Sequence, residues 1–398
     1  MNIDNLHQLI DRYDQNYSLI NNSENDEIFK WRAVRCFQDV WFDDRYESYP
    51  FAEKFRTATR ECSVLVDNGQ VSPSNGIVKM AEQEPEEVER LFNEVLFADD
   101  NGDLELRQDH IEEFLEGIES VRQRCFPSFW KYSQDRHSAF TYLALYAPEE
   151  NYIYKYSEAE EFAKCIEYGI DIGSGRDFKL PAYYGMCDLV VEALQDHQPL
   201  LQKYRELVSG ADFYQDQSLH LLAFDIIYCA RAYNLYSGMT FRTKAESVKA
   251  YKLEELRKKE AAEKQAQIDE ISDQIHALEL RVAELSSISL LNVQVQHKQY
   301  GTGIVVAQKT PTITVQFEGV TKSFIINKKY PARPTFEDDA DIVAAFTEYD
   351  DLSRRLVVLQ KQLTPILFRL TLNKAEKCFF SAEYVANLNN FSAIFSAK

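Results

Sequence analysis

The stretch from Asn292 to Thr335 reads NVQVQHKQYGTGIVVAQKTPTITVQFEGVTKSFIINKKYPARPT and differs from both of its flanks. Apolar and β-branched residues alternate with polar ones in four short runs, and Gly or Pro residues separate them, which is the pattern of short strands joined by turns. The predicted strands are residues 293–297, 303–307, 312–317 and 322–326. Both flanks have helical spacing instead. The stretch therefore predicts a small all-β barrel set into a mostly α protein.

The same stretch is basic within an acidic protein. It holds a single acid, Glu318, and six basic residues, whereas the whole chain has a formal charge of −20. The segment thus contributes +5 and leaves about −25 on the remainder, an asymmetry of sign that is typical of an interaction surface. We expect the acidic first 240 residues not to bind nucleic acid. The basic residues are Lys298, Lys309, Lys322, Lys328, Lys329 and Arg333.

Two heptad seams of equal length bracket the β segment. Apolar residues spaced alternately three and four apart run from Ile268 to Leu285 and again from Tyr349 to Ile366, which is the a/d pattern of a coiled coil. Because both ends of an inserted domain must lie close together, the economical arrangement is an antiparallel coiled-coil hairpin with the barrel at its tip. The predicted stalk comprises residues 241–291 and 336–369, and residues 292–335 form the barrel. A homodimer, in which a seam pairs with a second copy, is the alternative.

The sequence of the first 240 residues predicts helices, apart from one β-hairpin. Residues 1–135 contain apolar stripes at helical spacing and form a predicted helical domain. Residues 136–240 predict an α+β region, because aromatic and β-branched runs at 140–146 and 152–156 flank a turn-like Ala-Pro-Glu-Glu-Asn and so predict a β-hairpin. Several helices follow it. Residues 370–398 are a predicted C-terminal packing segment.

No segment carries a complete chemical motif. The longest uncharged apolar run is far shorter than the ~18 residues of a membrane span, and no signal peptide opens the chain, so a cytoplasmic location is expected. Seven scattered cysteines without CxxC spacing fit neither a disulfide framework nor a zinc site. Residues 171–175 resemble the start of a nucleotide-binding loop and residues 99–104 a calcium loop, but each lacks required positions. We therefore predict no catalytic residue, no cofactor and no metal.

Residues 293–334 carry the motifs His297-Lys298-x-Tyr300-Gly301-x-Gly303-x-Val305, Ile313-Thr314-Val315-x-Phe317 and Lys322-x-Phe324. In these positions the chain resembles the SH3-like, Tudor-like barrel at the C-terminus of UvrD/PcrA-type helicases. The resemblance implies that the glycine pair makes a tight bend and that the terminal aromatic residue closes the core. Such barrels bind nucleic acid, RNA polymerase or other proteins, so the class of partner stays open.

A second resemblance lies near the N-terminus. The residues that carry it are Trp31 to Trp41, Gly76-Ile77-x-x-Met80-Ala81 and Pro85-Glu86-x-Val88-x-x-Leu91-Phe92. They are similar to N-terminal regions that accompany bacterial defence ATPases of the McrB restriction type. The chain itself has no G-x-x-x-x-G-K-[ST] motif, so any ATPase would be a separate subunit.

The sequence thus favours a non-catalytic binding or adaptor subunit, in bacterial DNA transactions or antiphage defence, that contacts nucleic acid or a protein such as an ATPase or nuclease subunit. The alternative is an enzyme of unrecognised type, whose site in the N-terminal 240 residues would be a pocket with converging polar groups. The candidate binding residues combine cations that can neutralise phosphates with rings that can stack on bases. They are Lys298, Tyr300, Lys322, Phe324, Lys328, Lys329, Tyr330 and Arg333.

Overall fold

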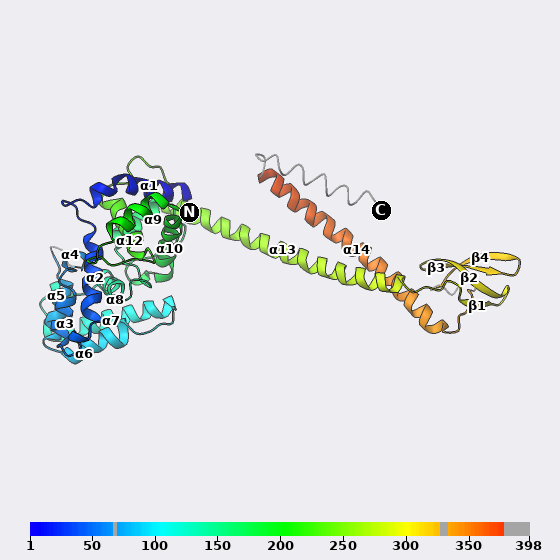
Figure 1. Ribbon diagram of the computed structural model, residues 1–398, viewed down its shortest axis with the longest axis horizontal. Coiled ribbons are helices and arrows are strands. Elements are labelled where there is room, and N and C mark those ends of the chain that lie inside the picture. Colours follow the sequence, from blue (N-terminus) through cyan, green and yellow to red (C-terminus); the bar gives the residue numbers. More distant parts are fainter. Residues whose placement is uncertain (67–69, 327–332, 378–398) are drawn as a thin grey trace. The chain divides into compact units, whose positions relative to one another are not determined.

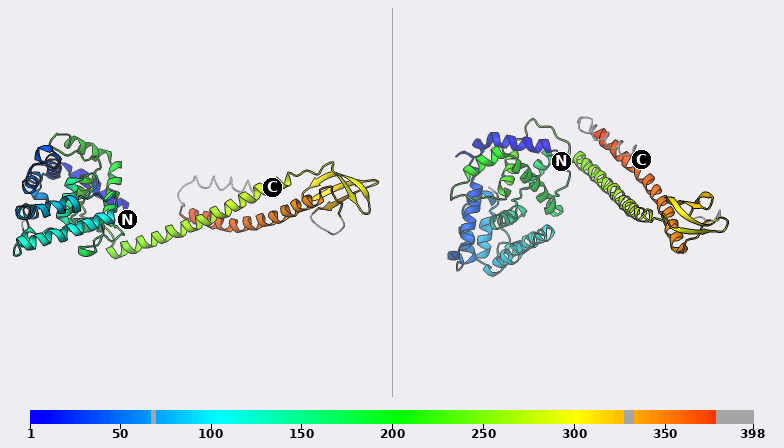
Figure 2. Two further views of the ribbon diagram at one scale, coloured as in Figure 1. Left: turned by 90° about the horizontal axis from the view of Figure 1, so that it is seen from below. Right: turned by 45° about the vertical axis from the view of Figure 1, so that its right-hand side comes forward.

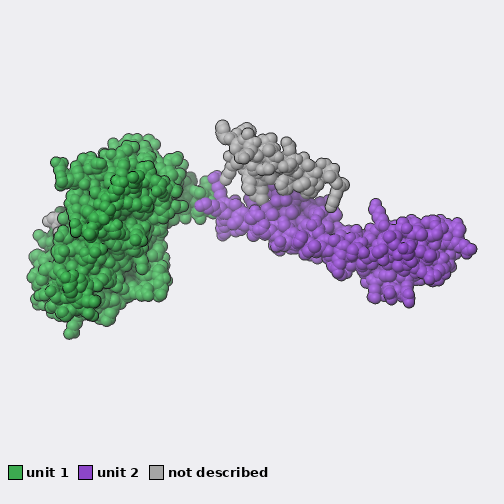
Figure 3. Space-filling model, viewed as in Figure 1, with its two compact units in different colours: residues 1–255 green, residues 256–398 purple. Residues whose placement is uncertain are grey.

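The computed structural model describes residues 1–66, 70–326 and 333–377 (Figure 1). The chain divides into two compact units, Met1–Glu255 and Leu256–Lys398 (Figure 3). The first unit is helical, and the second combines long helices with a four-stranded antiparallel sheet. The prediction of a mostly α protein with a small β segment is thus confirmed. Within the described residues, no helix has both the length and the apolar character needed to cross a membrane.

Short helices joined by tight turns make up the first unit. Their bounds are Ile3–Ile20 (α1), Phe29–Trp41 (α2), Phe51–Ala58 (α3), Ser63–Val66 (α4), Pro73–Ala81 (α5), Pro85–Arg90 (α6), Leu104–Cys125 (α7), Arg136–Tyr146 (α8), Tyr156–Cys165 (α9), Leu180–Asp196 (α10), Gln198–Leu207 (α11) and His220–Ala232 (α12). The other helical elements are Asp44–Tyr46 (η1), Trp130–Tyr132 (η3) and Gly175–Asp177 (η4), each a single turn, and the π-helical segment Leu91–Leu96 (η2), which continues α6. Prolines lie in the first turns of α5, α6, α10 and α11, where the missing N–H costs no hydrogen bond.

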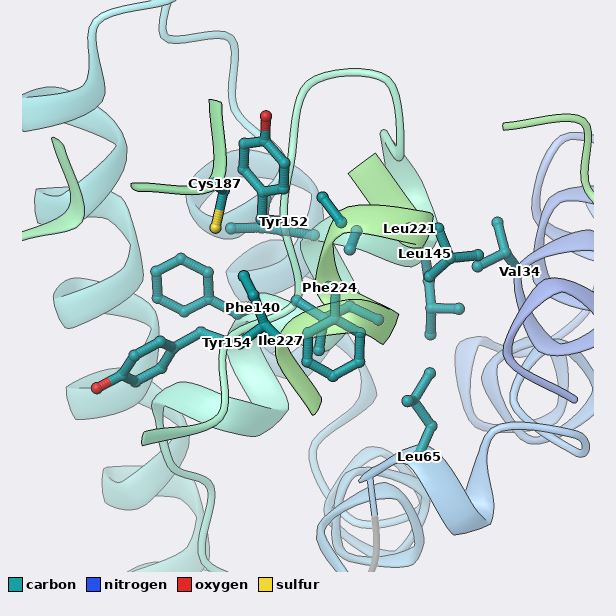
Figure 4. Packing of buried hydrophobic residues seen from close by; sticks show 14 of the residues in the cluster. Val34, Leu65, Phe140, Leu145, Tyr152, Tyr154, Cys187, Leu221, Phe224 and Ile227 are labelled. Carbon is teal, nitrogen blue, oxygen red and sulfur yellow. The ribbon is translucent and has the colours of Figure 1, made fainter. Parts of the chain in front are cut away.

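One continuous core fills the first unit. Figure 4 shows side chains from α2, α8, α10 and α12 that meet in it. The central helix α12 is buried on most sides, as its apolar sequence predicts. The core extends from Leu6 to Leu235, so residues 1–135 and 136–240, which we predicted as separate regions, share it. The predicted boundary falls inside this unit because helices from both halves, such as α2 and α8, pack on each other.

The predicted β-hairpin at residues 140–156 is wrong. Its first half lies in α8, whose first turn is closed by a capping box between Asp135 and Ser138. The aromatic run was misleading because the middle of α8 is buried all round, so the helix has no polar face by which it could be recognised. The second half leads into α9 and pairs with no strand of the described chain. A side chain satisfies part of its backbone instead, since the Tyr183 hydroxyl donates to the Ile153 carbonyl.

The sheet of the second unit is an antiparallel meander in the order β1-β2-β3-β4. Its strands, which lie close to the four predicted runs, are Gln294–His297 (β1), Gly301–Lys309 (β2), Thr312–Phe317 (β3) and Val320–Ile325 (β4). Gly301 has a φ of 72° and closes the turn between β1 and β2. Gly303 has no room for a Cβ, which would lie 2.6 Å from a ring carbon of Phe317. After β4 the chain returns to β1, where Gln296 and Thr335 exchange two backbone hydrogen bonds.

Two long helices flank the sheet in the sequence, Lys244–Ser286 (α13) and Asp339–Lys377 (α14). In the second unit they run beside each other in opposite directions (Figure 2). Arg281 forms a bidentate ion pair with Glu348 at 2.8 and 3.0 Å, and Gln360 donates to Glu279 at 3.4 Å. Every position of both predicted seams is buried or half-buried, whereas most positions between them are exposed. The contacts and the burial agree with the predicted antiparallel pairing.

Cysteine crosslinking tests this pairing. Ile275 and Leu359 are half-buried seam residues close to the contact between the two helices. We expect the variant with Ile275→Cys and Leu359→Cys to form a disulfide within one chain, identified by peptide mass spectrometry. Val358 is exposed, so the pair of Ile275→Cys with Val358→Cys is a matched control that should crosslink poorly. A disulfide found only between chains would favour the homodimer instead.

Candidate functional site

The aromatic residues of the predicted interface pack in the small core of the sheet. Phe324 is 8% exposed and Tyr300 is half-buried. The ring centroid of Tyr300 lies 4.8 Å from that of His297 and 5.4 Å from that of Phe317. His297 is buried with them, and its Nδ1 accepts from the backbone N–H groups of Gln299 and Tyr300 at 3.1 and 3.3 Å. These rings stabilise the core, and Phe324 offers no open face on which a base could stack.

Arg333 is held by an internal ion pair. Its guanidinium binds both carboxylate oxygens of Asp339 at 2.6 and 2.7 Å, and Asp339 also accepts from the backbone N–H of Phe336 at 3.2 Å. Hydrogen bonds from Arg333 hold the pKa of Asp339 below its usual value. The pair fixes the start of α14, so Arg333 is engaged within the fold. Three further candidates lie outside the described residues: Lys328, Lys329 and Tyr330.

Three lysines of the sheet are exposed and form no ion pair within the described part of the chain: Lys298, Lys309 and Lys322. They do not form one cluster. Lys298 lies in the β1–β2 turn and Lys309 at the far end of β2, a strand about 26 Å long. Lys322 lies on β4, on the same side of the sheet as the core residue Phe324. The basic charge is therefore spread over the sheet.

The face of the sheet away from its core is nearly uncharged. Its residues include Gln294, Thr302, Ile304, Thr314, Gln316, Thr321, Ser323 and Ile325. Among its described strand residues only Lys309, at one end, is charged. Ile304, Ile325 and the bulge residue Val306 are 49%, 41% and 50% exposed. These aliphatic side chains are accessible to a partner on a face that carries almost no charge.

Strand β4 forms an open edge of the sheet. One of its sides pairs with β3 along its whole length, and no described strand pairs with the other side. The Ile326 N–H donates to the Pro311 carbonyl at 3.0 Å, and the bonds of an antiparallel ladder alternate. The backbone groups of Thr321, Ser323 and Ile325 therefore point away from β3. An edge of this kind can accept an added strand.

A buried ion cluster in the first unit is a feature that sequence reasoning missed. The ammonium of Lys30 on α2 contacts the carboxylates of Glu27 and Asp225, and all three residues are buried. The hydroxyl of Tyr13 donates to Asp225, and that of Tyr233 donates to Glu27 at 2.9 Å. Burial alone would lower the pKa of Lys30, but the nearby carboxylates outweigh it and raise the pKa. Lys30 is thus a charged counter-ion at neutral pH and not a nucleophile.

The acidic groups of this cluster and a thiol lie close together. One ligand atom from each of Glu27, Asp225 and Cys229 falls within 4.8 Å of the others, a spacing that could hold a metal ion. The Lys30 ammonium, however, already contacts both carboxylates. Burial and the charge of Asp225 raise the pKa of the Cys229 thiol, which keeps it protonated. The arrangement fits an internal ion-pair network better than a metal centre.

The two incomplete loop motifs of the sequence are turns with local partners. Asp103 caps α7 by accepting two backbone N–H groups, and Asp100 forms a bidentate ion pair with Arg107 at 2.5 and 2.8 Å. In residues 171–175, Asp171 forms an ion pair with Lys244 at 2.9 Å. These carboxylates stabilise the turns and the helix ends beside them.

Comparisons with protein-family models, with curated proteins and with solved structures found no match to this chain. The resemblances to helicase barrels and to regions beside McrB-type ATPases stay predictions from short motifs. The function is therefore inferred from the geometry of the two units.

Proposed function

We propose that this chain is a non-catalytic adaptor whose sheet binds an extended, acidic segment of a partner protein along β4. The observation that carries the proposal is the open β4 edge, on which Lys322 has no acidic partner among the described residues. An added strand would form main-chain hydrogen bonds with this edge, and Lys322 on β4 would attract an acidic side chain of it. Ile304, Val306 and Ile325 offer the apolar contact that such a complex needs.

The proposal includes the architecture that displays the sheet. The Gln296–Thr335 bridge supports an SH3-like, Tudor-like barrel over residues 292–335, since it brings the chain that follows β4 back to β1. The half-buried seams of α13 and α14 support an antiparallel coiled-coil stalk that enters and leaves this barrel. Three further parts of the proposal rest on the sequence alone. They are a cytoplasmic location, an ATPase or nuclease as the partner, and a role in bacterial DNA transactions or antiphage defence.

The positions of the candidate residues favour a protein partner over nucleic acid. Binding of single strands uses exposed rings beside a cationic groove. Here Phe324 is buried, Arg333 is paired with Asp339, and the exposed lysines are dispersed. The described part of the sheet has a nearly uncharged face with a few exposed aliphatic side chains and an open edge, both of which suit a peptide.

Replacing Ser323 with proline tests the open edge. The Ser323 N–H points away from β3, so proline removes an outward donor and leaves the β3–β4 ladder paired. The probe is a fluorescently labelled peptide, Glu-Val-Glu-Val-Glu-Val, titrated with the full chain and followed by anisotropy. We expect Ser323→Pro to bind it about tenfold more weakly, as the loss of one or two net hydrogen bonds implies. Ser323→Ala keeps the N–H and should bind like the wild type.

Two further arms of this experiment decide the class of partner. The double variant Lys309→Glu with Lys322→Glu should bind the acidic peptide more weakly than the wild type, because it reverses the charge of Lys322 on β4 and of Lys309 on the neighbouring part of the sheet. Single-stranded and duplex DNA are titrated in the same way across salt concentrations. Salt-dependent DNA binding that this double variant abolishes would contradict the protein-docking proposal and favour nucleic acid. Peptide binding that Ser323→Pro leaves unchanged would exclude the β4 edge.

A further inference from the structure

A cleft of about 430 Å³ opens in the first unit beside the buried ion cluster. Residues of α2, α4, α8 and α12 line it, together with Lys155 from the segment before α9 and Arg60 from the connection between α3 and α4. Its volume lies within the range of sites that bind small molecules. The proposed docking of a protein on the sheet makes no use of this cleft.

Two cations that line the cleft have only loose partners. The Nε of Arg60 lies 3.9 Å from the Oε1 of the adjacent Glu61. The Nζ of Lys155 lies 3.9 Å from the Oε1 of Glu158, which Arg231 already engages at 3.0 Å. The side chains of Arg60 and Lys155 are 58% and 41% exposed. In an acidic protein, two weakly paired cations at one cleft can bind an anion.

The other basic groups of the cleft are committed to the fold. Lys30 and Arg32 form ion pairs with nearby carboxylates. The Nδ1 of His137 lies 2.7 Å from the Tyr154 carbonyl oxygen, and its Nε2 lies 2.9 Å from the Leu65 carbonyl oxygen. His137 thus uses both ring nitrogens within the protein. An anion would be bound by the two loosely paired cations.

Aromatic and aliphatic surface lies beside these cations. The ring centroid of Tyr228 is 4.8 Å from the Nζ of Lys155 and 4.3 Å from that of Lys30. Burial raises the pKa of the Tyr228 hydroxyl further above its ordinary value, at which a tyrosine ring is already neutral at pH 7. Phe29 and Val64 also line the cleft, and Val64 is 73% exposed. A ligand that fits the cleft combines an anionic group with an apolar ring.

We propose that this cleft binds a small aromatic phosphate monoester, with its phosphate against Arg60 and Lys155 and its ring beside Tyr228. Guanidinium and ammonium groups are the usual partners of phosphate, and the ligand would give both cations the close partner that the fold does not supply. Neutral Tyr228 and the exposed Val64 would cover the ring. The site belongs to residues 1–255, so its test is independent of the β4 edge.

Phenyl phosphate is the probe, titrated into the full chain and followed by calorimetry. We expect saturable binding that falls about tenfold in Arg60→Gln or in Lys155→Gln, and about a hundredfold in the double variant. Lys249→Gln with Arg257→Gln, on the exposed surface of α13, changes the net charge by the same amount and should bind like the wild type. Lys155→Arg keeps the charge and should also bind, which ties the loss in Lys155→Gln to the missing cation; the urea unfolding curve of Lys155→Gln, expected to match that of the wild type, checks its folding.

Three smaller probes separate the parts of the proposed site. Inorganic phosphate lacks the ring, phenol lacks the charge, and benzoate carries a carboxylate in place of the phosphate. Phenyl phosphate should bind more tightly than any of them. Absence of saturable binding of phenyl phosphate up to about 10 mM would overturn the proposal. Equal binding by the wild type and the double variant would also overturn it, as would tighter binding of benzoate.

Discussion

Replacing Lys30 with methionine is expected to destabilise the first unit by roughly 3 to 5 kcal/mol. The substitution leaves Glu27 and Asp225 buried without the cation that contacts both of them. A buried charge without a partner is far more costly than the loss of a surface ion pair. Methionine is an unbranched apolar side chain that adapts to irregular gaps, so the loss is mainly electrostatic. Urea unfolding followed by tryptophan fluorescence measures it, since all three tryptophans belong to residues 1–255.

Two variants separate this effect from a general effect of losing a lysine. Lys252 is exposed on α13, so Lys252→Met should change the free energy of unfolding by no more than about 0.5 kcal/mol. Adding Asp225→Asn to Lys30→Met removes one of the two uncompensated charges and should recover part of the stability. If Lys30→Met unfolds at the same urea concentration as the Lys252→Met control, the ion cluster contributes nothing and the argument for it fails.

Local patterns predicted the strands of the second unit and the two long helices that flank them. Both patterns depend on residues that are neighbours in the sequence. One is the alternation that buries Ile313, Val315 and Phe317 on one side of β3, and the other is the spacing of three and four along the seams. Such patterns depend little on distant contacts. The same alternation also indicated the face that we overlooked, because Ile304 precedes the buried Val305 and Ile325 follows the buried Phe324.

Contacts between distant residues explain most of what the sequence did not reveal. Lys30 lies on the apolar face of α2 with Ala33 and Phe37, which was a signal that a charge is buried there. Nothing near it in the sequence indicated its partner Asp225, which lies 195 residues away. The hairpin error at residues 140–156 has a similar origin, because helices from distant parts of the chain bury α8 on all sides and remove its helical periodicity.

The candidate interface also contains some features that the sequence could predict and others that it could not. The ion pair of Arg333 with Asp339, the first residue of α14, joins residues only six apart and could have been predicted from the sequence. Phe324 is buried in the small core of the sheet with Phe317. The sequence could not show which lysines lack an acidic partner. Acidic residues are numerous along the whole chain, so the pairing of each lysine depends on the three-dimensional arrangement of the sheet.

Asp216 should make the first unit less stable as the pH rises, which is the opposite of the usual effect of a buried, hydrogen-bonded carboxylate. Its carboxylate is buried before α12, where it accepts hydrogen bonds from the Leu222 N–H at 3.0 Å, the Tyr204 hydroxyl at 3.1 Å and the Ser218 hydroxyl at 3.2 Å. Burial raises its pKa from 3.8 to about 6 in spite of these bonds. Because the folded pKa is above the unfolded one, the stability that this group contributes is fully present below pH 3.8 and is lost as the pH rises through about 6.

Asp216→Asn removes this titration and keeps the hydrogen bonds, since the amide oxygen can accept from Leu222 and Tyr204 while the amide nitrogen donates to Ser218. The other carboxylates titrate in both proteins, so the difference between them isolates Asp216. The shift from 3.8 to about 6 corresponds to about 3 kcal/mol in total, at about 1.4 kcal/mol for each pKa unit. Between about pH 4 and pH 7, we expect the stability of the variant relative to the wild type to rise by roughly 2 to 2.5 kcal/mol of this, because the unfolded carboxyl is already partly ionised at pH 4. Urea unfolding at the two pH values, followed by tryptophan fluorescence, measures this rise. A difference that does not change with pH would mean that Asp216 titrates alike in the folded and unfolded chains, because its solvation would then be the same in both.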